Sequence, residues 1–447
     1  MTMSWVPRFA YPVPRMQGYE MSNAADLDIP HRIGRWAKSL GPGLITGAAD
    51  DDPSGIATYS ITGASTGLSM LWTALITTPM MAVLDGTCSR IGLVTGKGLM
   101  WSLARSMPRA LAFALAILVG LANTFNIGAD IDAMAGSAHL LAPLPFNVWL
   151  IIFAAIIIVV EVFVDYRQFA NVLRWLCLAL LAYIVTAFIV HPHWPAVLFN
   201  LIVPHFEWNR SWLTTLTAAL GTTITPYLFF WQTSMTAEER QARGREGRSD
   251  SASTSSIRAV HGDANTGAIY SNLVMFFIIV TSASTLGAHG AHNIGTAQDA
   301  AEALRPLAGN FAFALFTLGI VGTGLLAVPV LAGATAYMFA ELLGLREGLN
   351  VKLGRAREFY AIIVAGVLAG AIMGLVHVDP IKALFWSAVF NGVAAVPLIY
   401  AIIRLARDEG TLGKWVVSRA ARVWLWLAFG LMLVSAGGTI ASWFIKT

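Results

Sequence analysis

Charged residues are scarce in this sequence. Of its 447 residues, 12% are Asp, Glu, Lys or Arg and 56% are hydrophobic, which gives a mean hydropathy of +0.65. A soluble protein of this size would need more polar surface than these residues provide. The apolar residues instead form runs of roughly 20, the length that an α-helix needs to cross a bilayer. The composition therefore excludes a soluble protein and predicts an all-α polytopic membrane protein.

Cysteine is also scarce, and motifs of common enzyme classes are missing. The two cysteines, Cys88 and Cys177, lie in apolar stretches without CxxC spacing, so they predict neither a disulfide framework nor a thiolate metal site. No HExxH, GxSxG or P-loop pattern occurs at a plausible depth, and we expect neither an enzyme nor a resident cofactor. The net charge of +4 comes from basic residues scattered among the loops. This pattern favours a lipid bilayer over nucleic acid as partner, and no segment indicates an obligate protein partner.

The hydrophobic runs predict eleven membrane spans, with the N-terminus in the cytoplasm and the C-terminus outside. Of the 29 Lys and Arg residues, 25 fall in the N-terminal tail and the even-numbered loops. Cytoplasmic loops carry such an excess of basic residues. The first 35 residues lack the apolar core of a cleavable signal peptide, and this topology suits a bacterial inner membrane. The predicted spans are 40–65, 69–95, 110–138, 146–164, 169–190, 211–236, 267–287, 310–341, 358–377, 381–403 and 423–444.

The first span carries an acidic interruption near its middle, where Asp50, Asp51 and Asp52 precede Pro53. Proline removes an intrahelical hydrogen bond, and a carboxylate at the midplane costs at least about 2.5 kcal/mol on insertion scales. We therefore predict that the helix breaks around Asp52 and Pro53; a proline-kinked helix with its aspartates near an interface is the alternative. The freed carbonyl oxygens and the carboxylates are hard ligands for a cation. Three adjacent carboxylates cannot all stay ionised in a low dielectric without a cation, so we expect some of them to lie in water.

A second interruption occurs in the sixth span, LGTTITPYLFFWQTS from Leu220, where Thr225 and Pro226 divide an apolar run. Breaks in spans one and six are typical of a five-plus-five inverted repeat with its site at the midplane between the broken helices. The eleventh helix is then an appendage. The predicted domains are a cytoplasmic tail at 1–39, a first repeat at 40–190, a second repeat at 211–403 with a flexible cytoplasmic loop at 238–263, and an eleventh helix and C-terminus at 423–447.

These segments resemble a known transporter family. GPGLITGAADDDPSGIATYS from Gly41 and SRIGLVTGKGL from Ser89 are similar to the N-terminal signature of the NRAMP family, in which a DPGN break precedes an ARLGIVTGKDL-like stretch. The resemblance extends to GADIDAMAGSA from Gly128 and to the sixth span, and so covers most of the chain. It implies a LeuT-like fold, inward movement of divalent metals such as manganese and iron, and frequently proton cotransport.

The resemblance identifies Asp52 with the metal-binding aspartate of DPGN, and it also reveals departures. The asparagine of that motif falls on Gly55, and the Met-Pro-His of the family's sixth helix falls on Thr225, Pro226 and Tyr227. Losing a thioether while keeping carboxylate, hydroxyl and carbonyl oxygens makes the site harder, which suits magnesium and manganese. We therefore predict a divalent cation without choosing among manganese, iron and magnesium. The predicted metal-binding residues, with Asp52 ranked before Asp51, are Ala49, Asp51, Asp52, Gly55, Thr222 and Thr225.

Proton coupling requires a titratable group in the membrane, and the imidazole of the family's sixth helix is missing here. In the third span Asp130 matches a family acidic position, whereas the second such position falls on Ala133 with Asp132 beside it. We expect proton coupling to be weak or absent, and the sequence leaves open whether protons are transported with the metal. The proton-carrying or supporting candidates are Asp130, Asp132, Tyr227 and Asn391.

Two functions are consistent with the interrupted spans. The first is a secondary transporter that imports a divalent cation by alternating access around Asp52. The second is a LeuT-like symporter of a small organic solute, in which the aspartates hold a coupling cation. Negative charge at the first break repels a substrate carboxylate, and this favours the metal transporter.

Overall fold

The structure is a computed structural model that describes residues 47, 49–164, 180–245, 252–289, 294, 296–349, 351–375 and 379–444. All of these described residues belong to the unit Gly41–Thr447, to which the following description applies. The predicted tail at 1–39 and residues 169–179 of the predicted span 169–190 lie outside the described residues. Within the described ranges the regular elements are all helices, which confirms the all-α class.

Described helices stand at every predicted span. The two spans predicted to be broken contain α3 (Pro53–Thr66) and the pair α11 (Arg210–Thr223) and α12 (Pro226–Arg245). The predicted spans 69–95 and 169–190 contain α4 (Trp72–Thr95) and α9 (Leu181–Ile189). In the described part of the chain, seven helices are long and apolar enough to cross a membrane: α6 (Arg109–Leu141), α7 (Phe146–Phe163), α13 (Thr254–Thr285), α16 (Ala312–Leu343), α17 (Arg357–Gly374), α18 (Pro380–Leu405) and α20 (Arg419–Phe444).

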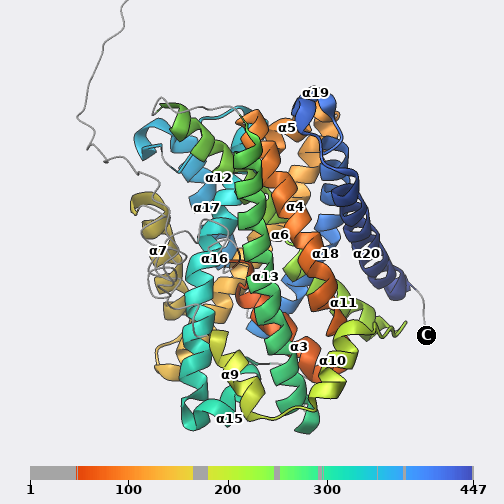
Figure 1. Cartoon of the computed structure of the whole chain (residues 1–447). Coiled ribbons are helices and arrows are strands. Elements are labelled where there is room, and N and C mark those ends of the chain that lie inside the picture. The colour runs from red at the N-terminus through yellow and green to blue at the C-terminus, as the bar shows by residue number, and fades with distance from the viewer. Residues whose placement is uncertain are drawn as a thin grey trace, which may run out of the picture. The chain divides into compact units, whose positions relative to one another are not determined.

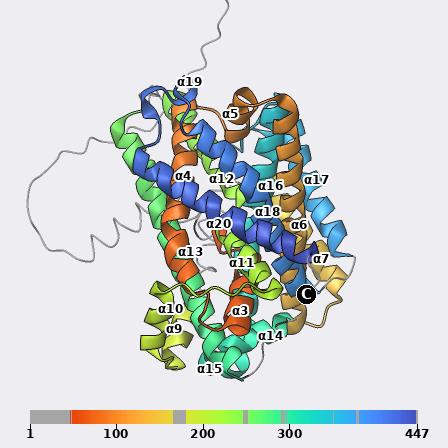
Figure 2. The same cartoon turned by 90° about the vertical axis from the view of Figure 1, so that its right-hand side faces the viewer.

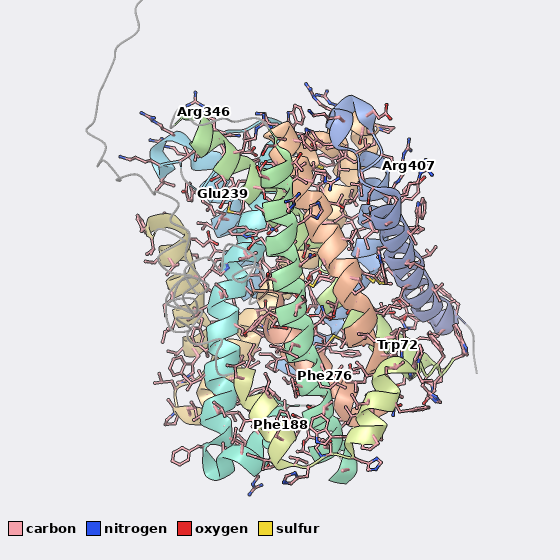
Figure 3. All side chains as sticks on the ribbon, in the orientation of Figure 1. Trp72, Phe188, Glu239, Phe276, Arg346 and Arg407 are labelled. Carbon is pink, nitrogen blue, oxygen red and sulfur yellow. The ribbon has the colours of Figure 1, made fainter. Side chains whose placement is uncertain are left out.

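Short helices lie at the two ends of the bundle. At one end are α5 (Leu99–Ser106) and α19 (Glu409–Leu412), which belong to predicted cytoplasmic loops (Figure 1). At the other end are α10 (Trp194–Ile202) and α15 (Arg305–Ala308), which belong to predicted outer loops (Figure 2). Figure 3 places Arg346 at the same end as α5. The predicted loops thus alternate between the two ends, as the distribution of basic residues requires.

The loop predicted at 238–263 is shorter than expected, because helices occupy both of its described ends. α12 continues to Arg245 and α13 begins at Thr254. The start of α13 is capped by Ser253, whose Oγ accepts from the Ser256 amide at 3.1 Å. Glu238 accepts a hydrogen bond of 2.6 Å from the Tyr337 hydroxyl on α16. The prediction of a flexible connector is therefore wrong for these ends, since serine caps and tertiary contacts stabilise helix there.

Glycines let the helices around α3 approach closely. A Cβ atom on Gly221 of α11 would lie 2.1 Å from the Ala388 carbonyl oxygen and 2.4 Å from the Gly392 amide nitrogen, both on α18. A Cβ on Gly370 of α17 would lie 2.8 Å from the Gly128 amide nitrogen on α6. α3 packs against α6, α11, α13 and α18, so these contacts hold the helices that surround the first break.

Candidate metal site

The first predicted break is present. Residues 47, 49 and 50 are helical, Asp51 and Asp52 are not, and α3 begins at Pro53. Asp52 caps α3, because its Oδ1 accepts from the Gly55 amide at 2.8 Å and from the Ser54 hydroxyl at 2.6 Å. Proline fits the first helical position because its missing N–H would have no partner there. The break predicted at Asp52 and Pro53 is confirmed.

The second predicted break is also present and lies against the first. α11 ends at Thr223, Ile224 and Thr225 are not helical, and α12 begins at Pro226. The hydroxyl oxygens of Ser54 and Thr222 lie 3.0 Å apart, and those of Tyr59 and Thr223 lie 2.9 Å apart. Side-chain hydroxyls therefore join the two interrupted helices directly.

Asp52 lies at the centre of this junction. Its Oδ2 accepts from the Asn126 amide at 3.1 Å, and the Tyr227 hydroxyl lies 3.5 Å from the same oxygen. The Tyr227 hydroxyl also donates to the Ala49 carbonyl at 3.0 Å. The Asn126 amide donates in addition to Asp130 Oδ2 at 3.2 Å. The structure thus groups Asp52, the Ala49 carbonyl and Asp130 around two polar side chains.

Asp50 and Asp51 face another helix. Asp50 Oδ1 accepts from the Thr225 hydroxyl at 2.9 Å, and its Oδ2 accepts from the Ser271 hydroxyl on α13 at 2.6 Å. The same Ser271 oxygen lies 3.2 Å from Asp51 Oδ1. Thr225 therefore contacts an aspartate next to the break, although that aspartate is Asp50 and not Asp52.

All three aspartates are fully buried, with 0% of their surface exposed. The expectation that some of them lie in water is wrong for this structure. The physical reason is the supply of hydroxyl groups: Ser54, Thr225 and Ser271 approach the carboxylates where water was expected. Buried polar groups require such partners.

Three other candidates relate to the junction in different ways. Gly55 has no side chain that could bind a metal, and its backbone amide donates a hydrogen bond to Asp52. Asn391 reaches the site through Asn126, since its amide donates to Asn126 Oδ1 at 3.4 Å. Asp132 points elsewhere: a Cβ on Gly374 of α17 would lie 1.9 Å from its Oδ1. Positions two residues apart on an α-helix are separated by about 200° around its axis, so Asp132 points away from the face that carries Asp130.

Sequence reasoning missed Asn126, Ser54 and Ser271. Asn126 could have been identified from the sequence, because it precedes Asp130 by four residues and therefore lies on the same helix face. Ser54 follows Asp52 in the broken segment and is polar at the same depth. Ser271 had a weaker signal, because serine in a membrane helix commonly bonds its own backbone. The ligand roles of all the candidate residues stay predictions.

The atoms that approach Asp52 as possible metal ligands are oxygens, whereas the Met275 thioether lies beside the second break, where it accepts from the Thr223 hydroxyl at 3.6 Å. Carboxylates, hydroxyls and one carbonyl converge there, and these suit hard cations. Among the described residues no group of three or more His, Cys, Asp and Glu could hold a metal by itself. A cation here would therefore be held by one or two carboxylates with hydroxyl, carbonyl and water oxygens.

Comparison with known proteins identifies a relative in sequence and structures of similar fold. The chain is 24% identical over 398 residues to the divalent metal cation transporter MntH of Listeria innocua, covering 87% of this chain and 86% of that one. It is similar in fold to a manganese transporter of Eremococcus coleocola, with a TM-score of 0.69, 18% identity and 92% and 89% of the two chains covered.

The predicted fold class is supported by a further solved structure. MhsT, solved in complex with L-phenylalanine, matches with a TM-score of 0.56 and 15% identity over 90% of this chain and 98% of that one. These two structural likenesses confirm the LeuT-like fold. Residues 43–442 match the family described as natural resistance-associated macrophage protein-like. The chain, an integral multi-pass membrane protein, therefore belongs to the Nramp family.

Proposed function

We propose that this protein is a secondary transporter that imports divalent metal cations by alternating access, with the cation bound between the broken helices. The observation that carries the proposal is the junction itself, in which the buried Asp52 carboxylate meets groups from both breaks. Asp52 forms no ion pair in the described part of the chain, and a buried carboxylate without a basic partner favours a cation. The relative named a divalent metal cation transporter and the fold neighbour named a manganese transporter support the same cargo class.

The ligands proposed for the cargo are Asp52, the Ala49 carbonyl and the Thr222 hydroxyl, with water completing the shell. The inclusion of Thr222 is supported by the 3.0 Å contact of its hydroxyl with that of Ser54, which in turn donates to Asp52. No thioether enters this set, so magnesium and manganese are favoured over softer metals such as cadmium. Iron belongs to the same proposed range.

We propose that proton coupling is weak. The position of the family's sixth-helix histidine is taken by Tyr227, whose hydroxyl donates to the Ala49 carbonyl. Asp130 is the nearby acidic group, and Asn126 connects it to Asp52. A phenol at this position is a poor substitute for an imidazole, because histidine titrates near neutral pH and tyrosine near pH 10.

A symporter of an organic solute is the second candidate, and the geometry argues against it. Such a carrier would use the free N-terminus of a half-helix for a substrate carboxylate. Here Asp52 already accepts from the Gly55 amide at the start of α3. α12 begins with Pro226, which has no N–H to offer. Both helix starts are therefore unsuited to an anionic substrate.

The proposed location is a bacterial inner membrane with the N-terminus in the cytoplasm. The end of the bundle that carries α5, α19 and Arg346 is then cytoplasmic, and the end that carries α10 and α15 faces outward (Figure 1). Inward transport moves the cation from the second end to the first.

The test is metal uptake into proteoliposomes that contain a metal indicator. Manganese or magnesium added outside should quench the indicator, and Asp52→Ala should reduce the initial rate to that of empty liposomes. Asp132→Asn is the matched control, because this carboxylate is also buried in a membrane helix but faces α17. Full uptake by Asp52→Ala would refute the proposed site.

A further inference from the structure

The three consecutive aspartates of the first break face two different helices. Asp52 contacts Asn126 on α6, whereas Asp50 and Asp51 contact Ser271 on α13. Figure 2 shows α6 and α13 on opposite sides of α3 and α11. The side of the break that faces α13 therefore has its own pair of carboxylates, separate from Asp52 and Asp130 on the side that faces α6.

One proton on Ser271 cannot satisfy both of these carboxylates. Its oxygen lies 2.6 Å from Asp50 Oδ2 and 3.2 Å from Asp51 Oδ1, and a hydroxyl carries a single hydrogen. If the hydrogen points to Asp50, the other contact joins two oxygen atoms with no hydrogen between them. Asp51 Oδ2 has no hydrogen-bond partner among the described residues, although Asp51 is 0% exposed. Acceptor oxygens therefore exceed donors at this point.

An independent observation comes from α4. Asp85 on this helix is 3% exposed, and its Oδ1 has no hydrogen-bond partner in the described part of the chain. α4 packs along α13, the helix that carries Ser271. A third buried carboxylate with an oxygen that lacks a hydrogen-bond partner thus lies on the helix that packs against α13, on a segment distant in sequence.

The charge on this side of the break has no basic partner in the described ranges. No ion pair of Asp50 or Asp51 is formed among the described residues. Burying two carboxylates without compensation is costly, and a bound cation is one of the few ways to offset that cost. The donor atoms are carboxylate and hydroxyl oxygens, which are ligands for hard divalent ions.

We propose that Asp50 and Asp51, with the hydroxyls of Thr225 and Ser271, form a second binding site for a hard divalent cation beside the cargo site at Asp52. This inference rests on the proposed function, because it assigns the Asp52 side to the cargo. Thr225 joins the second site to the break between α11 and α12, and Ser271 joins it to α13. An ion in this site therefore connects both breaks to a continuous helix.

The test is the stoichiometry of manganese binding to the purified full-length protein in detergent, measured by equilibrium dialysis. The wild type is expected to bind two ions, and Asp51→Asn and Ser271→Ala one ion each. Asp52→Asn is also expected to bind one ion, at the remaining site. Ser282→Ala, which removes a buried hydroxyl from the same helix away from the cluster, should still bind two. Size-exclusion profiles establish which variants are folded, and Asp51→Asn changes the shape of the side chain least.

Each other result overturns the inference in a distinguishable way. One ion in the wild type, lost in Asp52→Asn and kept in Asp51→Asn, refutes the second site and leaves the proposed function intact. One ion lost in Asp51→Asn and kept in Asp52→Asn refutes both, because the cargo then binds at Asp51. Two ions in the wild type that Asp51→Asn and Ser271→Ala both retain place the second ion elsewhere and refute these ligands.

Discussion

The side-chain amide of Asn126 donates to Oδ2 of both Asp52, at 3.1 Å, and Asp130, at 3.2 Å. A primary amide carries two hydrogens, so both bonds can form at once. Asn391 supports this arrangement by donating to Asn126 Oδ1 at 3.4 Å. Through Asn126, α6 thereby holds Asp52 of the first break. Asn126 also connects the proposed cargo site to a second carboxylate, that of Asp130.

Replacing Asn126 tests that connection. In Asn126→Ala both carboxylates lose a donor, and hydrogen bonds to charged groups contribute about 1.5–3 kcal/mol, equivalent to a factor of roughly 10 to 100. We expect the manganese concentration for half-maximal uptake to change by at least about tenfold, the lower end of that range. Asn123→Ala is the control, because the Asn123 amide donates to the Thr335 hydroxyl on α16 at 2.9 Å and its removal takes no donor from Asp52 or Asp130. Equal effects of the two substitutions would contradict a specific role for Asn126.

Thr225, which belongs to the proposed second site, tests whether metal selection during uptake also depends on the break between α11 and α12. Thr225→Met introduces a thioether where the hydroxyl now donates to Asp50 Oδ1. Thioethers favour soft metals, so cadmium should compete with manganese more effectively in the variant. The longer side chain must also fit a buried position, and overpacking costs about 1–3 kcal/mol, so total uptake should fall. The measurement is the ratio of cadmium to manganese inhibition constants, with Thr225→Ser as the conservative control. An unchanged ratio in Thr225→Met would show that this position does not select the metal.

The pH dependence of stability should be sensitive to Glu347, which follows α16 in a loop. Burial and the neighbouring charges of Glu341 and Glu238 raise its pKa from 4.5 to about 8, against the opposing effect of Lys97. The folded protein therefore keeps a proton on Glu347 that the unfolded chain releases at lower pH. Since the folded state binds more protons between these values, stability falls as the pH rises from about 4.5 to about 8 and levels off above that.

The measurement is thermal unfolding in detergent across this pH range, followed by tryptophan fluorescence. Glu347→Gln should remove part of the decline in Tm, because the amide stays neutral at every pH in the range. Glu358→Gln is the control, since Glu358 is exposed on α17. An identical decline in the wild type and in Glu347→Gln would exclude Glu347 as its source.

Gly221 tests the packing that holds the second break. In Gly221→Ala the new Cβ would lie 2.1 Å from the Ala388 carbonyl oxygen, and backbone atoms cannot yield as a flexible side chain can. We expect a loss of stability of about 1–3 kcal/mol and a lower uptake rate. Gly262→Ala, which meets nothing within 4 Å, should leave Tm unchanged or slightly higher, because alanine is the better helix former. A Gly221→Ala variant with normal Tm would contradict the close contact.

The fold could be predicted largely from the sequence because hydropathy and proline position depend on local physics. The pairs Asp52 with Pro53 and Thr225 with Pro226 predicted both breaks, and the structure confirms them. The partners of the aspartates could not be predicted in this way. Ser271 lies 221 positions from Asp50 in the chain, and only the packing of α13 against α3 brings the two together. Water was expected around the acidic residues because the distant hydroxyls were not foreseen.

Burial of the junction has a consequence for how fast ions can move. Asp52 and Asp130 are both 0% exposed, so an ion at this depth exchanges with neither compartment until helices shift. Each turnover of the proposed transport cycle must then include a rearrangement of the bundle, and such collective motions take microseconds to milliseconds or longer. Throughput is accordingly capped by backbone movement, far below the rate at which ions diffuse through an open pore, and it should respond steeply to temperature and bilayer stiffness.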